Sequence, residues 1–153
     1  MDLAHVHPML VHFPIVLFLL AFCLQFLVVA RGGDLAEHQC LANTTLAILI
    51  LAAAAAVVTA IFGDIAFDAA VANGYPTDPI ERHEGFGLTT MWVFLGIAAL
   101  QLLAWWRRVP LSGGRGWAMV GLGAVGVVLV IVTAYFGGDL VYNLGVNVAS
   151  GAS

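Results

Sequence analysis

Four apolar runs, each about 20 residues long, constrain this chain more than any other feature. They cover approximately residues 9–30, 41–62, 85–106 and 117–136. At a rise of about 1.5 Å per residue, a helix of this length crosses a hydrocarbon core about 30 Å thick. The runs therefore predict four transmembrane helices in a single domain over residues 1–153. The expected fold is all-α, an integral membrane antiparallel four-helix bundle.

Composition supports a membrane protein over a soluble one. Of the 153 residues, 62% are apolar and only 9% are charged, too little charge to cover a soluble domain. The sequence carries no nucleic-acid-binding motif, nucleophile elbow, P-loop or dinucleotide fingerprint. Cys23 and Cys40 lie outside any CxxC or CxxCH motif, which argues against covalent c-type haem. The lipid bilayer is thus an expected partner, and nucleic acid is not.

The distribution of arginine predicts the orientation. Four of the five basic residues flank the first and third loops: Arg31, Arg107, Arg108 and Arg115. By the positive-inside bias these loops are cytoplasmic, so both termini and the loop over 63–84 face the periplasm of a bacterial inner membrane. The N-terminus lacks a basic leading region, so the first run is expected to be a retained helix. The tail over 137–153 is expected to form a short strap on the outer face.

With this topology, four histidines gather near the outer face: His5, His7, His12 and His83. A histidine in an apolar run is costly in lipid and usually faces the bundle interior or a functional site. Spans 1 and 3 lie diagonally in an antiparallel bundle, so inward-facing His12 and His83 could bind both faces of a haem b. His7 would then hydrogen-bond the site or replace one ligand, and Arg82 would pair with a propionate.

The acidic residues support a second hypothesis, a single transition-metal ion. Asp64 and Asp68 are four residues apart and share a helical face if the second span extends that far. Together with His7, His12 and His83 they would form a mixed nitrogen and oxygen site for zinc, copper or iron. Alternatively, these carboxylates and Asp139 orient the imidazoles.

Haem is favoured because the two best-placed histidines are expected on diagonal helices. This hypothesis predicts an electron carrier rather than an enzyme, with a redox partner protein at the periplasmic face. A third hypothesis is a non-catalytic membrane anchor subunit of a redox complex. The sequence is compatible with a homodimer. The two helical hairpins have similar lengths but show no obvious repeat.

The opening of the chain resembles that of a known bacterial membrane family, domain of unknown function 2231. Residues 7–15 read His-Pro-Met-Leu-Val-His-Phe-Pro-Ile, and the closing elements are Gly-Gly-Asp-Leu-Val-Tyr over 137–142 and Gly-Val-Asn-Val over 145–148. The resemblance covers nearly the whole chain. It implies four spans, a Gly-x-x-Asp-like end of helix 2, here the more closely spaced Gly63-Asp64, and a histidine opening helix 3. It also implies a redox setting, since members look joined to, or encoded with, Rieske proteins and cytochromes.

Overall fold

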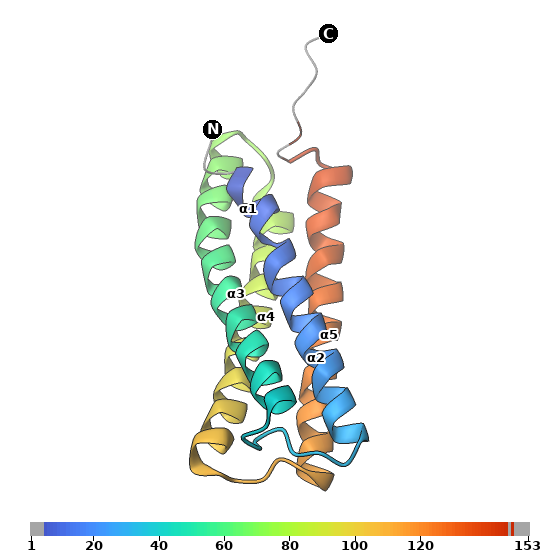
Figure 1. Cartoon of the computed structure of the whole chain (residues 1–153). Coiled ribbons are helices and arrows are strands. Elements are labelled where there is room, and N and C mark those ends of the chain that lie inside the picture. Colours follow the sequence, from blue (N-terminus) through green and yellow to red (C-terminus); the bar gives the residue numbers. More distant parts are fainter. Residues whose placement is uncertain (1–4, 147, 149–153) are drawn as a thin grey trace.

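The computed structural model describes residues 5–146 and 148, and every element among them is a helix. The elements are α1 (Val6–Leu10), α2 (His12–Ala30), α3 (Cys40–Ala72), α4 (Thr77–Arg107) and α5 (Gly113–Tyr142). Because α1 continues almost directly into α2, they form one span, and the described residues contain four helices long and apolar enough to cross a membrane. Figure 1 shows these helices side by side, which confirms the expected all-α bundle.

The first span is interrupted at Val11. Pro14 has no N–H group, so it cannot donate to the carbonyl of Leu10, four residues earlier. The turn stays closed because the N–H of Val11 donates to the carbonyl of His7 at 3.1 Å. Beyond the interruption, α1 packs against α3 as well as against α2. Val11 keeps helical dihedral angles (φ −55°, ψ −28°), so the helical backbone continues through the interruption.

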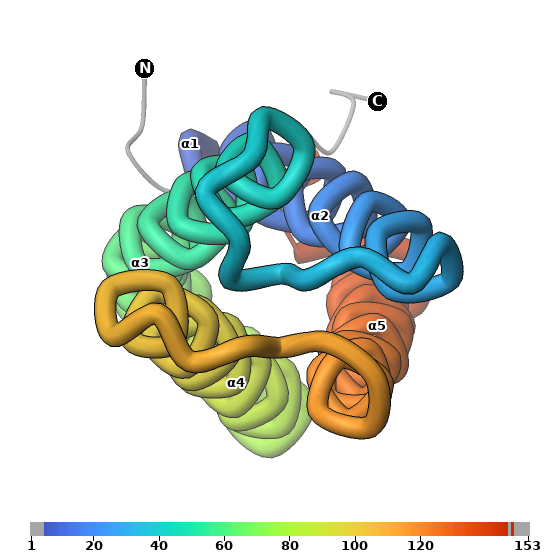
Figure 2. The backbone as a smooth tube through the Cα atoms, turned by 60° about the horizontal axis from the view of Figure 1, so that its bottom comes forward, coloured from blue at the N-terminus to red at the C-terminus, as the bar shows by residue number. Residues whose placement is uncertain are grey.

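The four spans are arranged around a square, as Figure 2 shows. Helix α2 packs against α3 and α5, and α4 packs against the same two helices. Consequently α2 and α4 form one diagonal, while α3 and α5 form the other. We call the end with the loops over 31–39 and 108–112 the loop end. The opposite end, with α1, the turn over 73–76 and the last turn of α5, is the terminal end (Figure 1).

Contacts across the α2–α4 diagonal form the centre of the bundle. Phe18 of α2 stacks on Phe94 of α4, with ring centroids 3.7 Å apart and planes inclined by 6°. Closer to the loop end, the side chain of Gln25 donates a hydrogen bond of 2.7 Å to Gln101, which itself donates to the carbonyl of Leu35. Polar side chains buried between membrane helices are stabilised by such mutual bonds. The two glutamines thus join α2 to α4.

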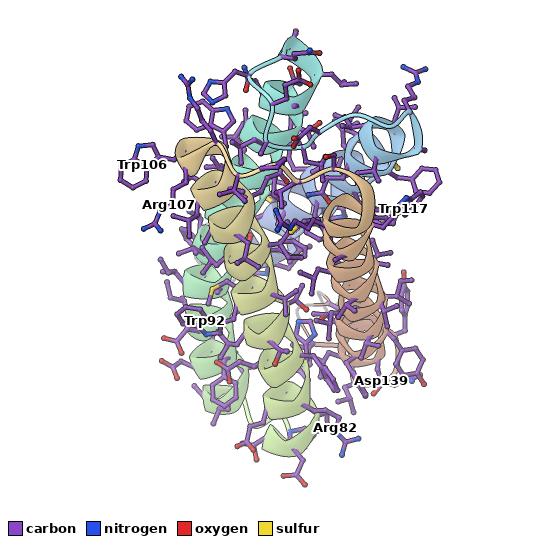
Figure 3. The ribbon with its side chains drawn as sticks, turned by 90° about the horizontal axis from the view of Figure 1, so that it is seen from below. Arg82, Trp92, Trp106, Arg107, Trp117 and Asp139 are labelled. Atoms are coloured by element: carbon purple, nitrogen blue, oxygen red, sulfur yellow. The ribbon has the colours of Figure 1, made fainter. Side chains whose placement is uncertain are left out.

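The outward surface of the bundle is suited to lipid. Large apolar side chains are exposed along all four spans, for example Leu20, Val125 and Ile131. Charged residues lie toward the ends instead, together with several of the exposed aromatic residues, whereas Trp92 is exposed midway along α4. Figure 3 shows Trp106, Arg107 and Trp117 at the loop end, and Arg82 and Asp139 at the terminal end. This distribution is typical of the two water interfaces of a bilayer, so the chain is a multi-pass membrane protein in contact with lipid.

The helices extend further at the terminal end than the apolar runs predicted. Helix α3 continues to Ala72 and α4 begins at Thr77, so the loop expected over 63–84 is reduced to a turn over 73–76. They continue because their inner faces still pack there: the buried residues Ala70, Ile80 and Leu140 form a second small core.

The expected C-terminal strap is also largely helical. Helix α5 continues through residues 137–142 and ends at Tyr142. A turn over 143–146 follows, in which the N–H of Val146 donates to the carbonyl of Leu140 at 2.9 Å. The hydroxyl of Tyr75 holds this turn by donating to the carbonyl of Gly145 at 3.0 Å. Of the expected strap, residues 147 and 149–153 lie outside the described part of the chain.

Candidate functional site

Two histidines meet inside the bundle at the terminal end. His7 lies in α1 and His83 lies near the start of α4, so they approach each other from diagonally opposite spans. Their ring centroids are 6.3 Å apart and the ring planes are inclined by 77°. Both residues are partly buried. The diagonal meeting of two imidazoles predicted from sequence is therefore present, although with a different pair of histidines.

Each imidazole is anchored to a carbonyl group of another helix. Nδ1 of His7 lies 3.0 Å from the carbonyl oxygen of Thr59 in α3, and Nδ1 of His83 lies 3.1 Å from that of Thr133 in α5. A carbonyl oxygen only accepts hydrogen bonds, so Nδ1 carries the hydrogen in both rings. In the neutral ring, Nε2 then bears the lone pair. Metal-ligating histidines commonly show this arrangement, with one nitrogen donating to a carbonyl and the other free to bind.

Both Nε2 atoms border open space. The hydrogen bonds of the two rings use Nδ1, and none of the buried side-chain nitrogen or oxygen atoms in the described residues lacks a hydrogen-bond partner. An unpaired Nε2 is therefore accessible rather than enclosed by packed protein. Both histidines line the adjacent cavity, and each ring has an accessible lone-pair nitrogen.

Two glycines make room for the rings. A Cβ atom at Gly63 would come within 3.2 Å of Cε1 of His7, and one at Gly137 would come within 2.9 Å of Cε1 of His83. Each glycine is located one helical turn after the threonine whose carbonyl binds the ring. The imidazole therefore lies over the glycine and reaches the preceding turn, a position that a larger residue would obstruct.

A cavity of about 560 Å³ adjoins the two imidazoles. All four spans contribute to its wall, which is mostly apolar. Alanines and glycine at helical spacing on α3 keep it open: Ala56, Ala60, Gly63, Ala66 and Ala70. Phe94 of the central stacked pair also lines it, as does Val146 of the C-terminal turn. Its volume is within the range of about 300–1,000 Å³ that small-molecule and cofactor sites occupy.

The structure corrects the expected pairing of His12 with His83. His12 is exposed, although it is among the residues that line the cavity, and it makes no contact with His83 like that of His7. Five residues separate His12 from His7, which corresponds to about 140° around a helix, so the two cannot both point inward. His7 occupies the inward position instead. His5 is exposed as well.

The other expected site residues lie away from the imidazoles. Asp64 and Asp68 share a helical face as predicted, but this face is exposed, because the neighbouring Gly63 is the position that faces His7. Asp139 accepts a hydrogen bond of 2.6 Å from Asn143 rather than from an imidazole. The guanidinium of Arg82 lies 5.8 Å from the centre of the Phe136 ring.

The mixed metal site is therefore not assembled as expected. Among residues 5–146 and 148, no group of three or more histidine, cysteine, aspartate and glutamate side chains could hold a metal ion. The two imidazoles remain as the potential ligands that the fold brings together.

Four residues of the site escaped prediction from the sequence: Thr59, Gly63, Thr133 and Gly137. The sequence feature that could have identified them is a short segment that occurs twice. It reads Thr-Ala-Ile-Phe-Gly-Asp over 59–64 and Thr-Ala-Tyr-Phe-Gly-Gly-Asp over 133–139. Each copy supplies the carbonyl and the glycine for one histidine.

The fold and this site define an integral membrane four-helix protein with two opposed imidazoles beside an apolar cavity. The chain belongs to the family of predicted membrane proteins with domain of unknown function 2231, whose family model matches residues 4–150. The resemblance noted at both ends of the sequence is thus confirmed. Neither a curated protein nor a solved structure matches the chain.

Proposed function

We propose that this chain binds one haem b between His7 and His83 and acts as a one-electron carrier in the membrane. The observation that carries the proposal is the pair of carbonyl-anchored imidazoles, 6.3 Å apart between ring centroids. A metal bound to two opposed imidazole nitrogens at about 2 Å each separates the ring centres by about 6 Å. The ring separation thus supports one iron atom between the two histidines.

The number of protein ligands favours haem over a bare metal ion. Zinc in a protein site usually takes three or four protein ligands. This cavity offers two imidazoles and the half-buried Glu84, while Asp64 and Asp68 are exposed. No group of three such side chains in the described residues could hold a metal ion. Haem iron needs only two axial ligands, because the porphyrin supplies the other four. A flat apolar macrocycle also accounts for the volume and lining of the cavity, which a single ion does not.

The protein's contribution would be to position the imidazoles and to exclude water. The carbonyl groups of Thr59 and Thr133 fix the tautomer of each ring and increase the basicity of Nε2. The apolar wall limits the solvent reorganisation that accompanies a change of charge. Haem, when bound, supplies a one-electron redox couple. The pairing of Arg82 with a propionate stays a prediction.

The site is best placed near one surface of the membrane. His83 precedes Trp106 by 23 residues in the sequence, and this corresponds to about 35 Å along α4, somewhat more than a hydrocarbon core. We assign the arginine-rich loop end to the cytoplasm and the terminal end to the periplasmic side of a bacterial inner membrane. A periplasmic redox partner would then approach the site from the terminal end. One chain supplies both imidazoles, so the proposed site does not require a second copy. The homodimer stays a prediction.

The proposal is tested by the cofactor content of protein purified from cells supplied with a haem precursor. We expect one haem per chain by the pyridine haemochrome assay, a Soret band, and sharpened visible bands after reduction. Elemental analysis of the same sample provides the comparison. Stoichiometric zinc or copper without porphyrin would contradict haem and support the metal-ion hypothesis. A chain that retains neither would support the anchor-subunit hypothesis instead.

A further inference from the structure

The two halves of the bundle repeat each other along the α2–α4 diagonal. Three pairs of like residues meet there, and the members of each pair are 76 positions apart: His7 and His83, Phe18 and Phe94, Gln25 and Gln101. The histidine rings meet in a T-shaped arrangement, the phenylalanine rings stack, and the glutamines share a hydrogen bond. The two loops show the same spacing. Leu35 and Leu111 are also 76 positions apart, and the N–H of Leu35 donates to the carbonyl of Leu111 at 3.2 Å.

The other diagonal carries the same repeat. The duplicated Thr-Ala-x-Phe-Gly segment occupies α3 in the first half and α5 in the second, and each copy binds the histidine of its own half. Equivalent residues meet each other when they lie on a two-fold axis. Residues 7–64 and 83–139 are therefore two copies of one helical hairpin, related by a pseudo-two-fold axis along the bundle. The square arrangement in Figure 2 follows from this relation.

We infer that the cofactor is held by two equivalent half-sites on this axis, and that Gly63 and Gly137 are their positioning residues. Each half-site consists of a histidine from the first helix of a hairpin and a carbonyl and glycine from the second. The glycine permits the close approach that lets Nδ1 reach the carbonyl and leaves Nε2 free. Only the identity of the ligand rests on the proposed function, because the half-sites are defined by protein contacts alone.

Replacement of each glycine by alanine distinguishes positioning from general packing. Gly137→Ala is expected to have the larger effect, because its Cβ would lie 2.9 Å from the ring of His83, against 3.2 Å between Gly63 and His7. Gly85→Ala is the matched control. Gly85 lies in α4 two residues after His83, and a Cβ there would meet nothing within 4 Å.

Nitrogen-15 magnetic resonance of the haem-free protein tests the half-sites without any cofactor. In the unmodified chain both imidazoles are expected as the Nδ1–H tautomer, with assignments from His7→Gln and His83→Gln. Gly63→Ala should shift the nitrogen-15 signals of the His7 ring, and Gly137→Ala should shift those of the His83 ring. Gly85→Ala should shift the signals of neither ring. The Nε2–H tautomer in the unmodified chain would overturn the inference, even if the alanine variants did not fold. Shifts no larger than those of Gly85→Ala would also overturn it.

The haem-loaded protein provides a second readout. Disturbing a group that orients a metal ligand typically weakens metal binding by about 10–100-fold. We expect haem retention to fall about tenfold in Gly137→Ala and less in Gly63→Ala, with a partial change from a low-spin to a high-spin optical spectrum. Haem binding that is equal in all three alanine variants would contradict the positioning role. If the unmodified chain binds no haem but shows the expected tautomers, the proposed function fails and the half-sites stand.

Discussion

His7→Ala and His83→Ala are each expected to lower the affinity for haem by more than about 100-fold, beyond the loss typical of residues that only orient a ligand. Each substitution removes one of the two imidazoles that the bundle brings together, and the exposed carboxylates of Asp64 and Asp68 cannot replace it. The measurement is the ratio of haem to protein after purification, followed by titration of haem into the empty variant. Circular dichroism and size-exclusion chromatography would verify that the variants fold.

His12→Ala is the matched control for these variants. His12 lies in the same span as His7, but its side chain is exposed and its removal takes away no anchored imidazole. We expect it to retain at least about half of the haem, since substitutions on an exposed surface are usually tolerated. Loss of haem in His12→Ala with retention in His7→Ala would restore the pairing expected from the sequence and contradict the one seen in the structure.

Gly126→Leu is expected to destabilise the bundle by about 3 kcal/mol, the upper part of the range for overpacking a core. A Cβ at Gly126 of α5 would overlap the ring of Phe18, and that ring is stacked on Phe94 at the centre of the bundle. The ring cannot move aside without breaking the stack. The measurement is reversible unfolding in mixed micelles with increasing sodium dodecyl sulfate, followed by circular dichroism.

Gly121→Leu gives the comparison on the same helix. A Cβ at Gly121 would meet nothing within 4 Å, and the position is exposed on the lipid-facing surface. We expect a change within about 0.5 kcal/mol of zero, as for most surface positions. Equal destabilisation by the two leucines would show that any bulk on α5 is harmful, and would contradict a specific role for Gly126 beneath the phenylalanine stack.

Much of the architecture could be predicted from the sequence because it depends on local composition. The apolar runs defined four spans, and short loops required sequential helices to be neighbours. This placed α2 and α4 on a diagonal and brought two histidines to the same depth.

The rotation of each helix could not be predicted in the same way. His7 and His12 both lie in an apolar stretch, and the pattern of apolar residues there does not show which of them faces inward. The repeat was missed because lipid-facing positions accept most apolar residues, so the two halves share identities only at sparse interior sites. The additional Gly138 between Gly137 and Asp139 further obscures the second copy.

The most direct test of the account is electron paramagnetic resonance of the oxidised, haem-loaded protein, with and without nitrogen-15 histidine. We predict a low-spin ferric signal whose hyperfine couplings report two imidazole nitrogens, one of which disappears in His7→Ala and the other in His83→Ala. A high-spin signal in the unmodified protein, or imidazole couplings that persist in both variants, would contradict a haem held between these two histidines.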